Sequence, residues 1–139
     1  MPPRLDEGDH VTAEEIVNEF TARITKLDFD GAFELVAPDI EYDNVPIGKV
    51  EGPDGIRGVF AQLDAMGVDA MEWIVHRQVA SDTTVLNERT DKFRANGGWA
   101  GVDVAGVFEV RDGKITLWRD YFDMNAMTVA ITELAGGGA

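Results

Sequence analysis

The spacing of apolar residues divides the chain into a helical first part and a second part made of strands. Up to Gly67, apolar residues recur every three or four positions, which is typical of helices that bury one face. Thr12 and Glu15 have the spacing of a capping box, and Gly52-Pro53 suits a helix start because proline is tolerated in the first turn. The pattern predicts helices at 12–27, 28–37 (ended by Pro38) and 52–66, with a strand at 39–45.

After Gly67 the apolar residues alternate with polar ones, as they do in half-buried strands. This pattern predicts strands at 69–80, 83–94, 100–111 and 114–122, joined by short turns, and a last helix at 124–135. Consecutive strands with short turns form an antiparallel meander. We therefore expect an α+β fold, in which a curved, cone-shaped, mixed but mainly antiparallel sheet packs against three to four helices and encloses a deep pocket.

Length and composition limit the possibilities. The 139 residues suit one domain over 1–139, with 1–11 and 136–139 expected to be flexible. A formal net charge of −14 argues against nucleic acid and anionic membranes as partners, because both favour a positive surface. The chain has no cysteine, so it offers neither a disulfide nor a thiolate site. It shows no signal peptide or membrane span, and we expect a cytoplasmic protein.

A few charged residues lie on the apolar side of the predicted strands. Residues two apart in a strand share a face, so Arg89 and Asp91 point inward together with Val85 and Phe93. Asp120 lies in the same way between Trp118 and Phe122, and Tyr42 and Asn44 share the inner face of the first strand. A buried charge is costly unless it is paired. The pattern therefore predicts that Arg89 pairs with the two aspartates inside the sheet.

This set of residues suits acid–base chemistry on water. Two neighbouring carboxylates cannot both ionise easily, so one can hold a proton and act as an acid while the other acts as a base. Tyr42 and Asn44 offer hydrogen bonds that can hold the water. Such a set is suited to the hydrolytic opening of an activated ring without a metal. The alternative is a purely structural ion network, which would also perturb pKa values.

The motifs resemble those of the limonene-1,2-epoxide hydrolase family, which has a nuclear transport factor 2-like (SnoaL-like) fold. Tyr42-Asp43-Asn44, Glu88-Arg89-Thr90-Asp91 and the run from Trp118 to Asp123 carry the resemblance. It implies one-step addition of water to an epoxide, without a cofactor or a covalent intermediate. It also implies that Asp91 is the general acid, Asp120 the base and Arg89 the bridge between them, with Tyr42 and Asn44 positioning the water.

The resemblance and the strand pattern also suggest what lines the substrate pocket. An apolar lining implies an apolar substrate such as a cyclic or terpene-like epoxide. Core filling is the more usual role of a single methionine, but two methionines are also candidates for the lining. The predicted substrate-binding residues are Phe93, Val102, Val104, Trp118, Phe122, Met66 and Met71.

Two other functions remain open on the sequence alone. One is an isomerase or cyclase of the ketosteroid-isomerase or polyketide-cyclase type on the same fold, and the other is a non-catalytic module that binds an apolar ligand. We expect no metal site, because His76 has no cluster of ligands near it in the pattern. We expect a homodimer that pairs through outward apolar residues of the sheet, namely Ile74, Leu86, Val107 and Leu117.

Overall fold

The computed structural model describes residues 11–136. Val11 packs against the core and Gly136 is the last residue of the last helix, whereas the other residues predicted to be flexible lie outside the described part. No helix within 11–136 is long and apolar enough to cross a membrane. The elements are α1 (Ala13–Thr25), α2 (Phe29–Phe33), β1 (Val36–Asn44), β2 (Gly48–Glu51), α3 (Gly52–Ala65), β3 (Val68–Ala80), β4 (Thr84–Ala95), β5 (Gly98–Arg111), β6 (Lys114–Tyr121) and α4 (Met124–Gly136).

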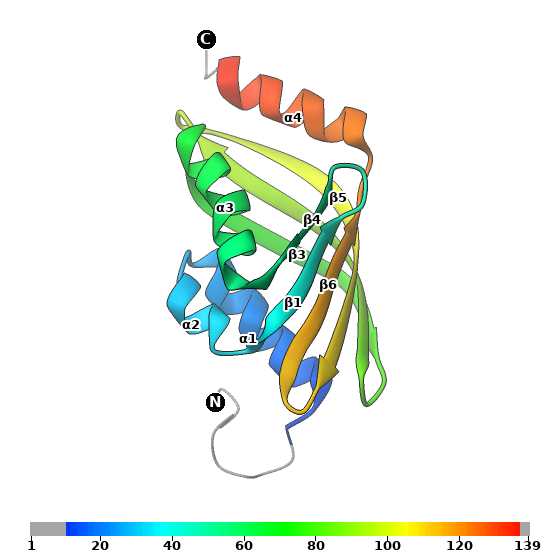
Figure 1. Cartoon of the computed structure of the whole chain (residues 1–139). Coiled ribbons are helices and arrows are strands. Elements are labelled where there is room, and N and C mark those ends of the chain that lie inside the picture. The colour runs from blue at the N-terminus through cyan, green and yellow to red at the C-terminus, as the bar shows by residue number, and fades with distance from the viewer. Residues whose placement is uncertain (1–10, 137–139) are drawn as a thin grey trace.

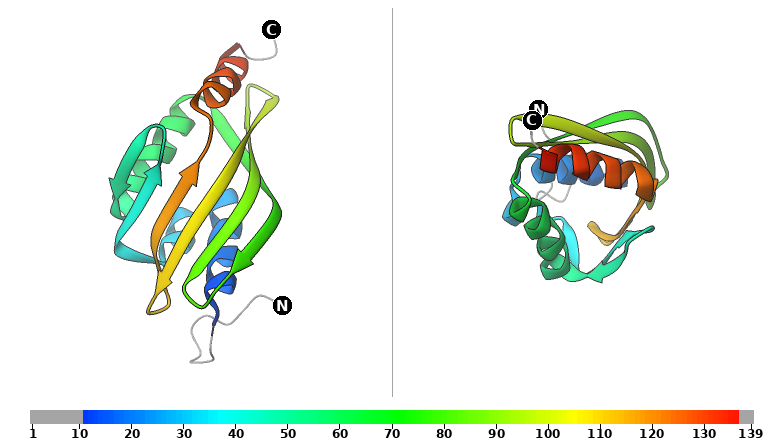
Figure 2. Two further views of the ribbon diagram at one scale, coloured as in Figure 1. Left: turned by 90° about the vertical axis from the view of Figure 1, so that its right-hand side faces the viewer. Right: turned by 90° about the horizontal axis from the view of Figure 1, so that it is seen from above.

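The six strands form one curved, unclosed sheet in the order β2-β1-β6-β5-β4-β3. Neighbouring strands are antiparallel except β1 and β6, which are parallel. Helices α1, α2 and α3 lie inside the curve, and α4 crosses its upper end (Figures 1 and 2). The predicted α+β class with a mixed, mainly antiparallel curved sheet is therefore confirmed.

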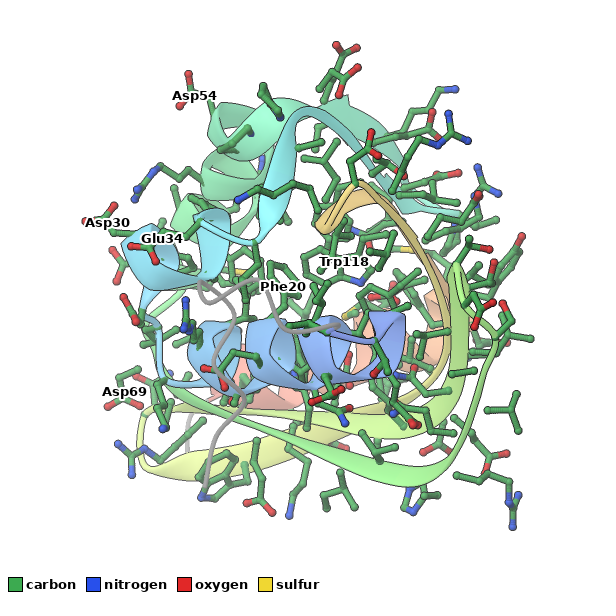
Figure 3. The ribbon with its side chains drawn as sticks, turned by 90° about the horizontal axis from the view of Figure 1, so that it is seen from below. Phe20, Asp30, Glu34, Asp54, Asp69 and Trp118 are labelled. Atoms are coloured by element: carbon green, nitrogen blue, oxygen red, sulfur yellow. The ribbon has the colours of Figure 1, made fainter. Side chains whose placement is uncertain are left out.

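Aromatic side chains fill the space between α1 and the sheet. Phe20 of α1 and Trp118 of β6 are fully buried, with ring centroids 5.3 Å apart in an edge-to-face arrangement. Figure 3 shows these two side chains facing each other inside the curve. Phe108 of β5 stacks on Trp118 at 6.1 Å and lies 6.5 Å from Phe20, so the three rings pack against one another. Pairs of this kind stabilise a core beyond the area they bury, so Trp118 is held firmly in place.

Local signals at the helix ends agree with the structure. Thr12 and Glu15 form the predicted capping box at the start of α1. Pro53 lies in the first turn of α3, and Gly67 follows the helix with a positive φ of 89°. Asp123 accepts a hydrogen bond from the backbone N–H of Ala126 at 2.8 Å and caps α4.

Two predictions about the region between α1 and α3 are wrong. The second helix ends at Phe33 instead of at 37, and β1 begins at Val36 and continues through Pro38. Proline lacks an N–H for a ladder, but β2 pairs with β1 only from Glu41 onward, so Pro38 interrupts no pairing with β2. The short strand β2 was not predicted, because its four residues are mostly exposed and show no alternation.

The outward apolar residues are only partly as expected. Ile74 and Leu86 are exposed on the convex face, with exposed fractions of 37% and 45%, and Val107 is half-buried. Leu117, however, is buried, so the prediction that it is exposed is wrong. It lies at the bottom of a shallow hollow shared with Arg111 and other charged residues of the neighbouring strands. Their long apolar stems can cover a leucine while the charges stay in water.

Candidate active site

A row of residues crosses the concave face of the sheet, one from each of five adjacent strands. In register, Asn44 of β1 lies beside Asp120 of β6, which lies beside Gly106 of β5. Gly106 in turn lies beside Asn87 of β4, and Asn87 beside Gln78 of β3. Four members of this row carry polar side chains. The fifth member, Gly106, has no side chain, and the space left above it determines the geometry of the site.

The guanidinium group of Arg89 occupies the space above Gly106. A Cβ atom at position 106 would lie 2.2 Å from Nη1 of Arg89 and 2.7 Å from Oδ1 of Asn87. It would also lie 3.1 Å from Oδ1 of Asp120. Because all three atoms lie within contact distance of the missing side chain, any residue other than glycine would have to displace the guanidinium.

Arg89 holds both aspartates, as the strand pattern predicts. Its Nε and Nη2 each donate to one oxygen of Asp91 at 2.9 Å, and Nη2 also donates to Oδ2 of Asp120 at 3.0 Å. Nη1 donates to Oδ1 of Asn87 at 2.9 Å. The ring of Trp73 faces the guanidinium with its centroid 4.8 Å away. Arg89 is fully buried, so protein atoms replace its hydration shell.

The charges of this cluster shift the pKa values of its members. Burial alone would lower the pKa of Arg89, but the charge of Asp120 and the hydrogen bonds with Asp91 outweigh it, so the pKa is raised and the cation persists. Burial raises the pKa of Asp120 to about 6, against the opposing effect of Arg89 and with a contribution from Asp91. One cation cannot neutralise two buried carboxylates, so the second negative charge favours uptake of a proton by Asp120 as the pH falls toward 6.

Asp120 is further fixed by the aromatic residues around it. Nε1 of Trp118 donates to Oδ1 of Asp120 at 3.0 Å. Tyr42 stacks on Trp118 with centroids 3.9 Å apart, beside it in the parallel β1–β6 register. Burial, followed by the negative charge of Asp120, raises the pKa of Tyr42, so its hydroxyl stays protonated. A protonated hydroxyl and the amide of Asn44 therefore flank the carboxylate that has the raised pKa.

A chain of side-chain amides connects Arg89 to helix α1. Asn87 accepts from Arg89 and donates from Nδ2 to Oε1 of Gln78 at 3.1 Å. Gln78 donates in turn to Oε2 of Glu14 at 3.0 Å and to Oδ1 of Asn18 at 2.9 Å. Each amide offers both a donor and an acceptor, so the chain is satisfied at every step. The orientation of Arg89 therefore depends on residues as far away as the surface of α1.

The two carboxylates open onto an apolar cavity of about 150 Å³ between the sheet, α3 and α4. Of the predicted residues, Tyr42, Asn44, Asp91, Asp120, Phe93, Val104, Phe122 and Met66 line it. Arg89 lies behind its two partners. Val102 and Trp118 are buried within the wall and do not line this cavity, and Met71 lines a neighbouring one.

Several residues of the site were missed from sequence. Neither Asn87 nor Gly106 was predicted to be part of the site, although strand alternation puts both on the inner face. The helix at 124–135 was predicted without its contribution to the cavity, although the spacing of its apolar residues indicated a stripe. The further lining residues are Ile47, Val59, Phe60, Gln62, Leu63, Trp73, Met124, Met127 and Ile131.

The family model described as the limonene-1,2-epoxide hydrolase catalytic domain matches residues 11–133. That span includes Arg89, its aspartates and every residue in its amide chain. The chain belongs to the limonene-1,2-epoxide hydrolase family. The structural neighbours of this limonene-1,2-epoxide hydrolase homologue confirm the predicted nuclear transport factor 2-like fold.

Relatives of the chain agree with this assignment. It is 37% identical over 111 residues to epoxide hydrolase EphG of Mycobacterium tuberculosis, covering 80% of this chain and 73% of that protein. A solved M. tuberculosis LEH-like epoxide hydrolase is 33% identical, with a TM-score of 0.73, covering 86% of this chain and 88% of that one. A protein with a ketosteroid isomerase-like fold from Catenulispora acidiphila shares the fold alone, at 22% identity and a TM-score of 0.71, covering 91% and 95% of the two chains.

We predict that Gly106→Ala disrupts the Arg89 cluster, that is, Arg89 with its hydrogen-bond partners Asn87, Asp91 and Asp120. The added methyl group must displace a guanidinium that is buried and held by four hydrogen bonds. The free energy of unfolding, measured by urea denaturation, should fall by about 1–3 kcal/mol, as for other overpacked buried sites. The control is Gly101→Ala on the same strand, where the new Cβ meets Cγ of Lys92 at 3.2 Å, Cγ2 of Thr90 at 3.3 Å and the backbone oxygen of Asp91 at 3.6 Å. Equal stability of the two variants would contradict the packing described.

Proposed function

We propose that the protein is a cofactor-free epoxide hydrolase that adds water to an apolar cyclic or terpene-like epoxide and gives a vicinal diol. One observation carries the proposal: two buried carboxylates share one guanidinium, and both line an apolar cavity. An acid and a base in one apolar site can act on opposite sides of a strained ring. Family membership supports the same reaction.

The surroundings of the two carboxylates suggest their separate roles. Asp120 lies beside Asn44 in register and close to Tyr42, so a water held by these two groups would be within its reach. A pKa of about 6 suits a base that works near neutral pH. Asp91 lies on the other side of Arg89, beside Trp73 in register. We assign Asp120 as the base and Asp91 as the acid that protonates the epoxide oxygen.

The reaction balances with one proton on the carboxyl pair. Asp91 gives its proton to the epoxide oxygen as the carbon–oxygen bond breaks. At the same time a water attacks the carbon from the opposite side and gives a proton to Asp120. The products are a neutral diol and a pair that still carries one proton, now on Asp120. Return of that proton to Asp91 through solvent completes the cycle, and Arg89 stabilises the pair in both states.

An isomerase or a simple binding module would not need this arrangement. A ketosteroid-isomerase-like reaction needs one base and a donor for the developing oxyanion, so a second carboxylate on Arg89 would be superfluous. A binding module has no use for buried charge, which costs stability that an apolar core would retain. The Arg89 cluster therefore favours hydrolysis over both alternatives.

The test is a single turnover in oxygen-18 water with a panel of cyclic and terpene epoxides. Because water attacks the ring directly in the proposed reaction, the first diol formed should carry the label. The protein carboxylates, examined by mass spectrometry of peptides, should stay unlabelled. An unlabelled first product with label in Asp91 or Asp120 would indicate a covalent intermediate and exclude the mechanism. Failure to open any epoxide would exclude the function.

Variants of the cluster serve as controls for the same assay. Asp91→Asn, Asp120→Asn and Arg89→Gln should each lower kcat by at least about 100-fold, as expected when an acid, a base or their bridge is lost. Asp103→Asn changes an exposed carboxylate on the other face of β5 and should retain the rate. Circular dichroism will show whether each variant is folded. A near-normal rate in a folded Asp120→Asn variant would refute its assigned role.

The activity should also depend on pH in a definite direction. Asp120 must be ionised to accept a proton, and its pKa is raised to about 6 by burial. We therefore expect kcat/KM to fall by about tenfold per pH unit below this value, because the base is then protonated. Rates measured in overlapping buffers, with the fold monitored at each pH, test this. A flat profile through pH 6 and below would mean that another group is the base.

We also propose that the protein acts in the cytoplasm as a homodimer. On the convex face, exposed Leu86 lies beside half-buried Val107, and exposed Ile74 lies on the next strand. Light scattering should give twice the chain mass of 15.2 kDa. Leu86→Lys should shift the protein toward single chains, because it places a charge in the apolar contact. A single-chain mass for the unmodified protein would contradict the dimer.

A further inference from the structure

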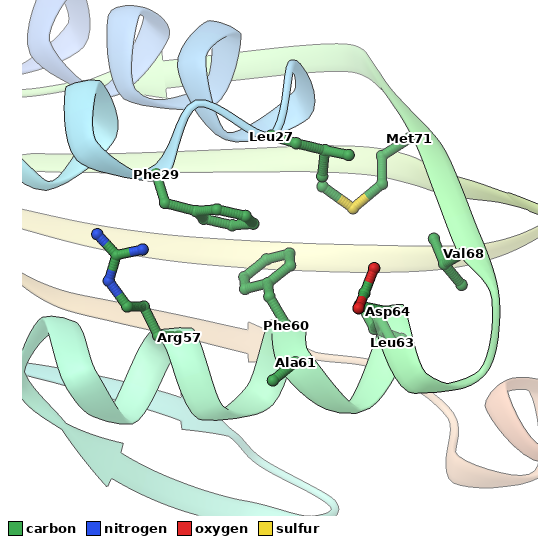
Figure 4. Close-up of a pocket in the computed structure, with 9 residues that line it drawn as sticks. All are labelled: Leu27, Phe29, Arg57, Phe60, Ala61, Leu63, Asp64, Val68 and Met71. Carbon is green, nitrogen blue, oxygen red and sulfur yellow. The ribbon is translucent and has the colours of Figure 1, made fainter.

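A second apolar cavity lies between α2, α3 and the start of β3. Its volume is about 330 Å³, which is larger than that of the cavity at the carboxylates. In Figure 4 the rings of Phe29 and Phe60 lie close to each other in its wall, with Met71 and Val68 toward one end. The residues that line it are Leu27, Phe29, Arg57, Phe60, Ala61, Leu63, Asp64, Val68 and Met71.

Two side chains of α3 belong to the walls of both cavities. Phe60 and Leu63 line the second cavity as well as the one that holds Asp91 and Asp120. The ring of Phe60 lies 5.4 Å from that of Phe29 on one side and 6.3 Å from that of Trp118 on the other, centroid to centroid. Trp118 in turn donates its hydrogen bond to Asp120. The partition is therefore made of side chains, which can change rotamer without any movement of the backbone.

The volumes indicate that the first cavity alone is small for a ligand site. At about 150 Å³ it lies below the range of roughly 300–1,000 Å³ that is usual for small-molecule pockets. The second cavity, at about 330 Å³, is adjacent and mostly apolar, and together the two fall within that range. No polar group on the shared wall would have to be desolvated to join them.

Of the two charged residues that line the second cavity, one already forms an ion pair and the other is exposed to solvent. Arg57 pairs with Asp30 of α2 and stacks over Phe33 at 5.0 Å, and Asp64 is exposed to solvent. The remaining lining residues are apolar. The chemistry of the cavity therefore favours an uncharged hydrocarbon over a charged or strongly polar group.

We propose that the second cavity receives the far apolar end of the substrate, and that Phe60 is the side chain that controls entry to it. The inference rests on the proposed epoxide hydrolysis and specifies its substrate class. The preferred epoxides carry a hydrocarbon chain or ring extension too long for the cavity at the carboxylates. The epoxide stays at Asp91 and Asp120, and the extension passes Phe60 toward Phe29 and Met71. Phe60 and Leu63 then determine specificity and take no part in the chemistry.

The experiment uses terminal epoxides of increasing length, from 1,2-epoxyhexane to 1,2-epoxydodecane, with diol formation followed by gas chromatography. For the unmodified protein we expect kcat/KM to rise with length, by up to about fourfold per methylene group while the chain is entering the second cavity. Phe60→Leu makes the wall between the two cavities thinner and keeps an apolar core residue. It should therefore increase the preference for the longest epoxide.

The decisive variant is one whose new side chain fills the second cavity. Ala61→Trp places a large ring at the wall of the second cavity and should lower the long-to-short ratio of kcat/KM by about tenfold or more. The matched control is Ala65→Trp, one turn further along α3, where the residue is exposed and lines neither cavity. This control should keep the ratio of the unmodified protein.

The outcomes separate this inference from the proposed function. If 1,2-epoxyhexane is opened but kcat/KM does not rise with length, the inference is wrong and the hydrolase function stands. The same conclusion follows if Ala61→Trp and Ala65→Trp give equal ratios. If the cyclic and terpene panel is opened but no epoxide of this series is, the inference is wrong and the hydrolase function stands. If the unmodified protein opens neither set, the proposed function fails and the inference fails with it.

Discussion

A single buried cation between two carboxylates is the constraint on which the rest of the site depends. Among residues 11–136, the polar side chains that are buried are those of Asn87, Arg89, Asp91 and Asp120, and all four are joined by hydrogen bonds. Removing such groups from water costs several kcal/mol per ion before any pairing. The cost is acceptable only with good geometry, and each neighbour of Arg89 contributes to that geometry.

Some of this cluster was predictable because strand alternation is a local property. The inward direction of Arg89, Asp91 and Asp120 follows from counting by two along each strand, and the structure places all three inside. The importance of Gly106 was not predictable in this way. It depends on which residues lie beside it on β4 and β6, and alternation along a single strand does not reveal that register. The sequence around a glycine in an apolar strand does not show which neighbouring side chain occupies the space left by its missing Cβ.

The errors elsewhere have similar causes. The end of α2 was misplaced because Val36 and Ala37 fit a helical pattern as well as a strand, and the pairing of β1 with β6 decides between them. The lining of the cavity was incomplete because α4 comes last in the chain and crosses the open end of the sheet, a placement that no local pattern encodes. The fold is shared with proteins of other activities, so function has to be argued from the Arg89 cluster and not from the shape of the sheet.

The parallel pairing of β1 with β6 has a consequence for how the site assembles during folding. The strands β3 to β6 follow one another through short turns, so Arg89, Asp91 and Asp120 meet through local hairpins. Tyr42 and Asn44 join them only when β1 docks, through contacts such as the ion pair of Asp43 with Arg119, which are 76 positions apart. Closing so long a loop costs entropy before any contact rewards it, and such contacts slow folding. The part of the site that would hold water is thus its most non-local part, and a ribosome must synthesise β6 before that part can form.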